Sequence, residues 1–139
     1  MTDEAPSLVD EYPLAICTSP ADFAAHYSEG RWQALYYLRV VSDAIADAIF
    51  AHQSRIIIVE APPRHGKSEL VSHWLPVWYA SVFPDRKILL ASYEARTAED
   101  WGRRVRNTLD EIKTVEMSAD SLSASRWHTK EGGGLQTAG

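Results

Sequence analysis

Residues 56–69 read IIIVEAPPRHGKSE, and this stretch decides the fold that the sequence predicts. Its first part, Ile56 to Val59, is an unbroken run of β-branched residues. A strand with one face in water alternates apolar and polar residues, so an unbroken run predicts a strand covered on both faces. The part from Lys67 to about Trp74 has helical character. Residues 60–66 are therefore expected to connect a central strand of a parallel sheet to a helix.

The connection ends in the last three residues of a Walker A loop, G-x-x-x-x-G-K-[ST], although Ala61 replaces its first glycine. Such a loop points successive backbone N–H groups, here from Arg64 to Ser68, at one spot beside a positive helix N-terminus. Gly66 lets the backbone approach a phosphate closely. Lys67 supplies a charge for the β- and γ-phosphates, and Ser68 offers a hydroxyl to Mg²⁺. The loop therefore predicts ATP and Mg²⁺ as cofactors.

The rest of the chain predicts helices around this loop and one further buried strand. Helices are expected from Ser19 to Gly30, from Arg31 to about Ala51 and over 95–112, with a kink or restart at Pro76. A second buried strand is expected over 87–92, and short strands over 127–129 and 135–137, joined through 132–134. The predicted fold is an α/β P-loop NTPase with a partial parallel sheet and flanking helices. Residues 1–18 are expected to form a loose leader before one domain over 19–139.

Composition excludes several classes of protein. The chain has 139 residues, enough for one modest domain, and no apolar run that approaches the length of a bilayer span. Its formal charge of −5 argues against a simple cationic DNA-coating protein. The lone Cys17 forms no internal disulfide, and no Cys/His cluster has zinc-ligand spacing. These features indicate a cytosolic protein without a membrane span.

The loop segment at 62–69, PPRHGKSE, looks like the Walker A segment of tailed-phage large terminase subunits. The similarity continues through residues 42–49, 74–79, 83–85, 90–93, 98–106 and 132–134, in the same order. It covers roughly residues 30–139, and it is therefore much more specific than the loop alone.

The resemblance implies an ATPase that pumps double-stranded viral DNA through the portal protein into a procapsid. In the family this motor works as a homo-oligomeric ring with a small terminase subunit, in the host cytoplasm. A C-terminal nuclease domain cuts the concatemer, using metal ions held by acidic residues. This chain has no apolar strand ending in Asp-Glu and no nuclease acidic cluster. It is therefore expected to be the N-terminal part of the ATPase domain and to hydrolyse ATP poorly or not at all.

The resemblance also implies roles for single residues. Lys67 and Arg64 are the candidate catalytic residues, with Arg64 as a sensor or cis-acting finger. The alternative for Arg64 is an ion pair that holds the loop shape. Phosphate contacts are expected from Gly66 to Ser68 and from Pro63, Arg64 and His65, although His65 is more a packing residue than an acid or base. The candidate for reading the adenine is Gln33, with Tyr37 or Leu38 as alternatives.

Two other functions remain open from the sequence. One is a small P-loop kinase, and the other is a non-catalytic remnant that keeps the α/β shape without binding nucleotide.

Four arginines between 96 and 106 suggest a DNA-contacting face. The spacing also predicts the i,i+4 pairs Glu99–Arg103 and Asp100–Arg104, which favour a solvated helix face.

Overall fold

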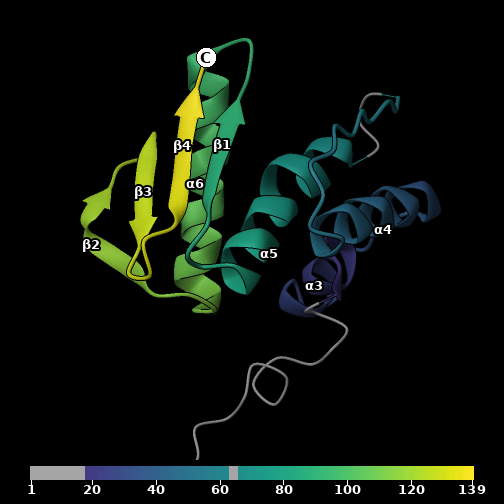
Figure 1. Cartoon of the computed structure of the whole chain (residues 1–139), viewed down its shortest axis with the longest axis horizontal. Coiled ribbons are helices and arrows are strands. Elements are labelled where there is room, and N and C mark those ends of the chain that lie inside the picture. Colours follow the sequence, from purple (N-terminus) through teal and green to yellow (C-terminus); the bar gives the residue numbers. More distant parts are fainter. Residues whose placement is uncertain (1–17, 63–65) are drawn as a thin grey trace, which may run out of the picture. The chain divides into compact units, whose positions relative to one another are not determined.

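A computed structural model describes residues 18–62 and 66–139 (Figure 1). The chain divides into two compact units, one up to Ala61 and one from Pro62. The predicted leader, apart from Thr18, lies outside the described residues. No helix of the described chain is long and apolar enough to cross a membrane.

The first unit is built on two helices, α3 (Pro20–Tyr27) and α4 (Tyr36–Phe50). The predicted cap of α3 is confirmed, because the Ser19 hydroxyl accepts a hydrogen bond from the amide of Asp22 at 3.2 Å. A second hydroxyl, from Ser42 on α4, accepts from the amide of Ala21 at 2.9 Å. It satisfies a first-turn N–H group that has no partner within the helix.

The second predicted helix was expected from Arg31, but α4 begins only at Tyr36. The reason is a side-chain hydrogen bond that replaces a helical one. The hydroxyl of Ser28 accepts from the amide of Trp32 at 2.9 Å. Such bonds offer the backbone an alternative to the helix.

The strand predicted over Ile56–Val59 is wrong for this structure. Residues 53–62 form neither helix nor strand, and Ile56 and Ile58 are 93% and 80% exposed. β-propensity expresses packing on a sheet, and a strand needs a neighbour for its N–H and C=O groups. The described residues of the first unit form helices only, so this run has no strand beside it there.

The second unit begins with a continuous helical stretch from Lys67 to Val82. Its middle is a π-helix, η1 (Glu69–Trp74), and its end is α5 (Leu75–Val82). The restart predicted at Pro76 is confirmed, since this residue lies in the first turn of α5. Proline has no N–H group to donate to the preceding turn, which explains the break in α-helical geometry.

A four-stranded sheet follows, in the order β1-β4-β3-β2 (Figure 1). Its strands are β1 (Lys87–Ala91), β2 (Met117–Leu122), β3 (Arg126–Thr129) and β4 (Gly134–Ala138), and α6 (Ala95–Ile112) follows β1. The predictions for α6, β1, β3 and β4 are confirmed within about a residue, whereas β2 was not predicted.

The sheet is mixed, so the prediction of a parallel sheet holds only in part. β1 and β4 are parallel, but β2 pairs with β3, and β3 with β4, in antiparallel fashion. Short turns join β2 to β3 and β3 to β4, and only antiparallel neighbours can be joined by so few residues. The fold class is therefore mixed α/β, with a single parallel pair among the described strands.

One face of the sheet packs against α6, and Trp127 and Leu135 are buried there together with Val105 and Leu109. Burial alternates along β1, and its Leu89 is 69% exposed. The expectation that β1 is covered on both faces is therefore wrong, because only one helix layer covers this sheet in the described residues.

The packing of α6 on the sheet depends on Gly102. A Cβ atom at this position would lie 2.8 Å from the carbonyl oxygen of Ala124 and 2.8 Å from Cγ2 of Thr137. Both distances are shorter than a real contact allows. No larger residue fits here unless α6 moves away from the sheet.

Replacing Gly102 with alanine is therefore expected to lower the free energy of unfolding by about 1–3 kcal/mol, the usual cost of overpacking a core. Urea unfolding of the second unit measures this change. Arg103→Ala changes the next, exposed residue of the same helix and is expected to cost less than about 0.5 kcal/mol. Equal losses for the two variants would show that the close approach is not what limits position 102.

Candidate functional site

The loop residues that the structure describes meet at the start of the helical stretch of the second unit. Gly66 has φ +83, a left-handed backbone conformation that residues other than glycine rarely adopt. Its carbonyl accepts from the amide of Leu70 at 3.0 Å, which is the first hydrogen bond of the helix. Lys67 and Ser68 follow in the first turn, where the N–H groups have no carbonyl partner within the helix. Such a junction is a ready site for an anion.

The accessibility of these residues fits contact with a ligand. Ser68 is exposed and Lys67 is half-buried, so both side chains can be reached from solvent. The other predicted loop residues, Pro63, Arg64 and His65, lie outside the described residues.

Gln33, the predicted adenine contact, belongs to the first unit, whereas Gly66–Ser68 belong to the second. Gln33 is exposed, and its Nε2 lies 3.5 Å from the carbonyl oxygen of Gly30. Of the two alternatives, Leu38 is buried in the core of the first unit. The role of Gln33 stays a prediction, since each unit is described by itself.

Directly after Ser68, a polar network ties the helix start to α6. Glu69 lies 3.1 Å from Nδ1 of His73 through one carboxylate oxygen. Its other oxygen lies 2.6 Å from a guanidinium nitrogen of Arg104. Nε2 of His73 lies 2.7 Å from the hydroxyl oxygen of Thr108. Residues near both ends of η1 are thus held to the second half of α6 by side-chain contacts.

The protonation of His73 follows from these partners. An ionised carboxylate only accepts hydrogen bonds, so the proton of a neutral ring lies on Nδ1, facing Glu69. Nε2 then accepts from the hydroxyl of Thr108. Burial is the largest effect and lowers the pKa of His73 below the 6.5 of a free histidine, and the charge of Arg104 lowers it further, whereas Glu69 opposes both. The geometry therefore holds a neutral imidazole with both nitrogens satisfied.

Arg104 also corrects the predicted ion pairs. It was expected to pair with Asp100, but it pairs with Glu69. Arg103 forms the ion pair with Asp100 instead, with 3.1 Å between the guanidinium nitrogen and the carboxylate oxygen. The prediction for Glu99–Arg103 is thus wrong as well. Sequence spacing could have found Glu69–His73, which is an i,i+4 pair, but not the choice of Arg104 between two acids.

The chemistry of the described residues fits a Mg²⁺ ion that is bound together with a nucleotide. Within residues 18–62 and 66–139, no group of three His, Cys, Asp or Glu residues lies close enough to hold a metal. The exposed hydroxyl of Ser68 is one suitable oxygen ligand. Mg²⁺ commonly completes its shell with substrate phosphates and water, so a single protein oxygen is chemically sufficient.

Stability is expected to depend on pH through His73. Because its folded pKa is lowered, the unfolded chain binds the proton more readily. The free energy of unfolding should therefore fall as pH decreases from about 7 through 6.5, by at most about 1.4 kcal/mol per pH unit for one proton. His73→Gln should reduce this slope, whereas His52→Gln, at an exposed residue, should not. Urea unfolding at several pH values tests this, and an unchanged slope in His73→Gln would refute it.

Comparison with known proteins gives no relative for the chain. No protein-family model, no curated protein and no solved structure matches it.

Proposed function

We propose that this chain binds the phosphates of ATP, together with Mg²⁺, at Gly66–Lys67–Ser68. The observation that carries the proposal is the loop-to-helix junction itself. Gly66 has the positive φ that favours glycine, and Lys67 and Ser68 open a helix directly after it. This is the structural setting that the last three residues of a Walker A motif require on the helix side.

Each residue of the junction has a separate task in this proposal. The amides of the first turn donate to phosphate oxygens, and Gly66 lets the ligand come close without a Cβ atom in the way. The ammonium of Lys67 neutralises charge on the β- and γ-phosphates. Mg²⁺ supplies further charge neutralisation when it is bound. Ser68 contributes a hydroxyl oxygen toward it, and the family resemblance makes Arg64 the candidate sensor or cis-acting finger.

The polar network behind the junction supports a preorganised site. Glu69 follows Ser68 directly, and its carboxylate lies against both His73 and Arg104. A helix start that is already fixed loses less conformational entropy when a ligand binds. Glu69, His73 and Arg104 therefore act as positioning residues for the amides of the first turn.

The wider role rests on the resemblance of residues 30–139 to tailed-phage terminase large subunits. In that role, ATP hydrolysis by the complete protein drives double-stranded DNA through the portal into the procapsid, in the host cytoplasm. The arginines of α6 are then surface groups of the motor domain. Arg103 and Arg104 form ion pairs with carboxylates of the protein, which argues against a role in binding DNA phosphates.

Loss of the loop lysine is the direct test. Lys67→Ala is expected to weaken Mg²⁺·ATP binding roughly ten- to a hundredfold, as the loss of a hydrogen bond to a charged group does. Isothermal titration calorimetry measures the dissociation constant. Lys130→Ala removes a lysine elsewhere on the same unit and is expected to leave it unchanged. Absence of ATP binding to the unmodified chain would favour the non-catalytic remnant.

Turnover is expected to be absent even where ATP binds. The sequence has no apolar run ending in Asp-Glu, which supplies the water-activating carboxylate in the terminase family that the chain resembles. Steady-state phosphate release should therefore stay at background. Release that Lys67→Ala abolishes would contradict this expectation, and phosphate transfer to a small acceptor would favour the kinase.

A further inference from the structure

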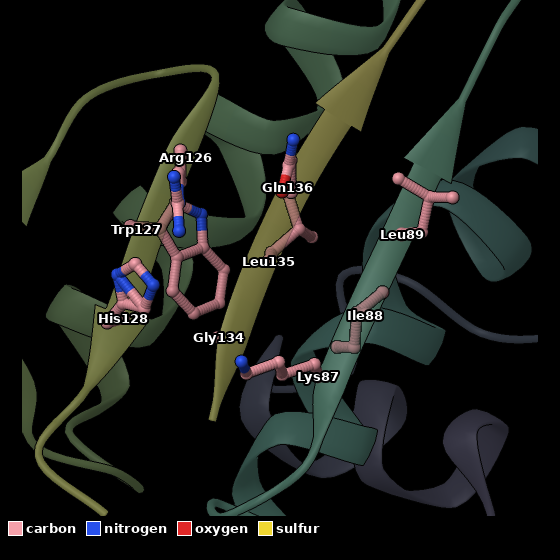
Figure 2. A pocket seen from close by; sticks show the side chains of 9 residues that line it. All are labelled: Lys87, Ile88, Leu89, Arg126, Trp127, His128, Gly134, Leu135 and Gln136. Atoms are coloured by element: carbon pink, nitrogen blue, oxygen red, sulfur yellow. The ribbon is translucent and has the colours of Figure 1, made fainter. Parts of the chain in front are cut away.

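A shallow hollow of about 220 Å³ lies on the sheet of the second unit (Figure 2). Residues of β1, β3 and β4 line it, and the side chains that bear on its chemistry are those of Lys87, Leu89, Arg126, His128 and Gln136. Lys87, Leu89, Arg126 and Gln136 are exposed, in contrast to the buried Trp127 and Leu135 that alternate with them. Strand alternation places these exposed side chains on the face of the sheet opposite to the side chains of Trp127 and Leu135, which also belong to the lining. No lining residue belongs to the loop at Gly66.

Strand register explains why there is a hollow at all. Lys87 on β1 and His128 on β3 both pair with Gly134 on the strand between them. Gly134 has φ +148, and a Cβ atom there would lie 2.2 Å from the carbonyl oxygen of Trp127, so only glycine fits. The central strand thus provides no side chain at this row. The outer two backbones are about 10 Å apart, which is two strand spacings.

The next row across the sheet adds a second set of polar groups. Leu89 and Arg126 both pair with Gln136, which replaces the bare glycine by an amide side chain. Rows two residues apart lie roughly 7 Å from each other along the strand. One small molecule can therefore touch both rows.

The charged residues that line the hollow are all basic. Its lining contains Lys87, Arg126 and His128 but no acidic residue. Figure 2 shows the ammonium of Lys87 reaching across toward Gly134. Within the described chain neither Lys87 nor Arg126 forms a salt bridge. Two cations that line a hollow without a carboxylate attract an anion and lower the cost of its desolvation.

We propose that this hollow binds a small phosphorylated compound, independently of the proposed ATP site. Lys87 contributes a mobile charge, and the guanidinium of Arg126 donates two parallel hydrogen bonds to phosphate oxygens. The side-chain amide of Gln136 is a further donor. The volume is below that of pockets for drug-sized ligands, which fits a phosphate group with a short carbon chain.

The basic side chains cover only a small area of the sheet, and this favours a small ligand over a nucleic acid. A polyanion is held by charges distributed along its backbone, and its affinity comes from many phosphate contacts. Here the three basic side chains lie within one hollow, and the row of Arg126 and Gln136 has the apolar Leu89 on β1 instead of another cation.

Titration of the full chain with inorganic phosphate and with glycerol 3-phosphate, followed by NMR, tests the proposal. All samples carry Lys67→Ala, so that the loop cannot account for binding, and sodium chloride keeps the ionic strength constant. Saturable shifts are expected at the amides of His128, Gly134 and Gln136. Lys87→Gln with Arg126→Gln should weaken binding at least about tenfold. The matched pair Arg103→Gln with Lys130→Gln, at exposed basic residues elsewhere on the unit, should leave binding unchanged.

The outcomes are distinct. Shifts that fail to saturate, or that sodium chloride alone reproduces, overturn the proposal. So does an equal loss of binding in both double variants. Saturable shifts at these residues with a DNA oligonucleotide, but with neither phosphate compound, also overturn it and identify a nucleic-acid surface. The single variants Lys87→Gln and Arg126→Gln replace the double variant if its amide spectrum shows unfolding. Failure of Lys67-dependent ATP binding in the unmodified chain affects only the proposed ATP site.

Discussion

The second unit depends on the close approach of α6 to the sheet at Gly102. The carbonyl of this glycine accepts from the indole nitrogen of Trp127 at 3.4 Å, and Trp127 is fully buried. A bulky residue at position 102 would separate the helix from the strands that it covers. Because Trp127 belongs to the middle of the sheet, its contact with α6 also fixes which face of β3 and β4 is buried. The alternation along these strands then follows, and with it the exposed face that carries the hollow.

The position of α6 also determines the start of the loop helix. Thr108 and Arg104 are one turn apart on α6, and they contact His73 and Glu69, which are one turn apart on η1. His73 is buried, and leaving a buried polar group without its partner costs about 1–3 kcal/mol, so its contact with Thr108 resists a sliding of one helix along the other. The π-helical turn between Glu69 and Trp74 lies within this network, and such turns are frequent at functional sites. The start of this helix is thereby joined to α6 through side chains and not through the backbone alone.

The sequence predicted the elements whose signals are local. Helix α6 shows an apolar stripe over five turns, and α3 carries its own cap at Ser19, so both could be found without knowledge of the neighbours. The prediction for Ile56–Val59 was wrong because a strand forms only beside a pairing strand. A β-branched run has the propensity for a strand, but it does not show whether a partner is present. β2 was missed for the opposite reason. Its residues, MSADSL, have no apolar alternation, and it becomes a strand through its pairing with β3.

The candidate site was predictable to a similar degree. The motif at Gly66, Lys67 and Ser68 predicts a helix that starts at the loop, which the structure has, and a strand before it, which residues 53–62 do not form. The partner of Arg104 was not predictable, since Asp100 and Glu69 both lie within reach of a long flexible side chain and only the packing of η1 on α6 decides between them.

The two proposed anion sites of the second unit differ in what holds the ligand. At Gly66–Ser68 the donors are backbone amides whose directions are fixed by the helix, so the site selects for a group of defined geometry. In the hollow the donors are the ends of Lys87 and Arg126, which are exposed. Charges on exposed side chains are strongly screened by salt, whereas amides at a helix start act mainly through short, directed hydrogen bonds. The hollow is therefore the weaker and more salt-sensitive of the two sites, and Gly134, which creates its space, is the residue that gives it any selectivity for size.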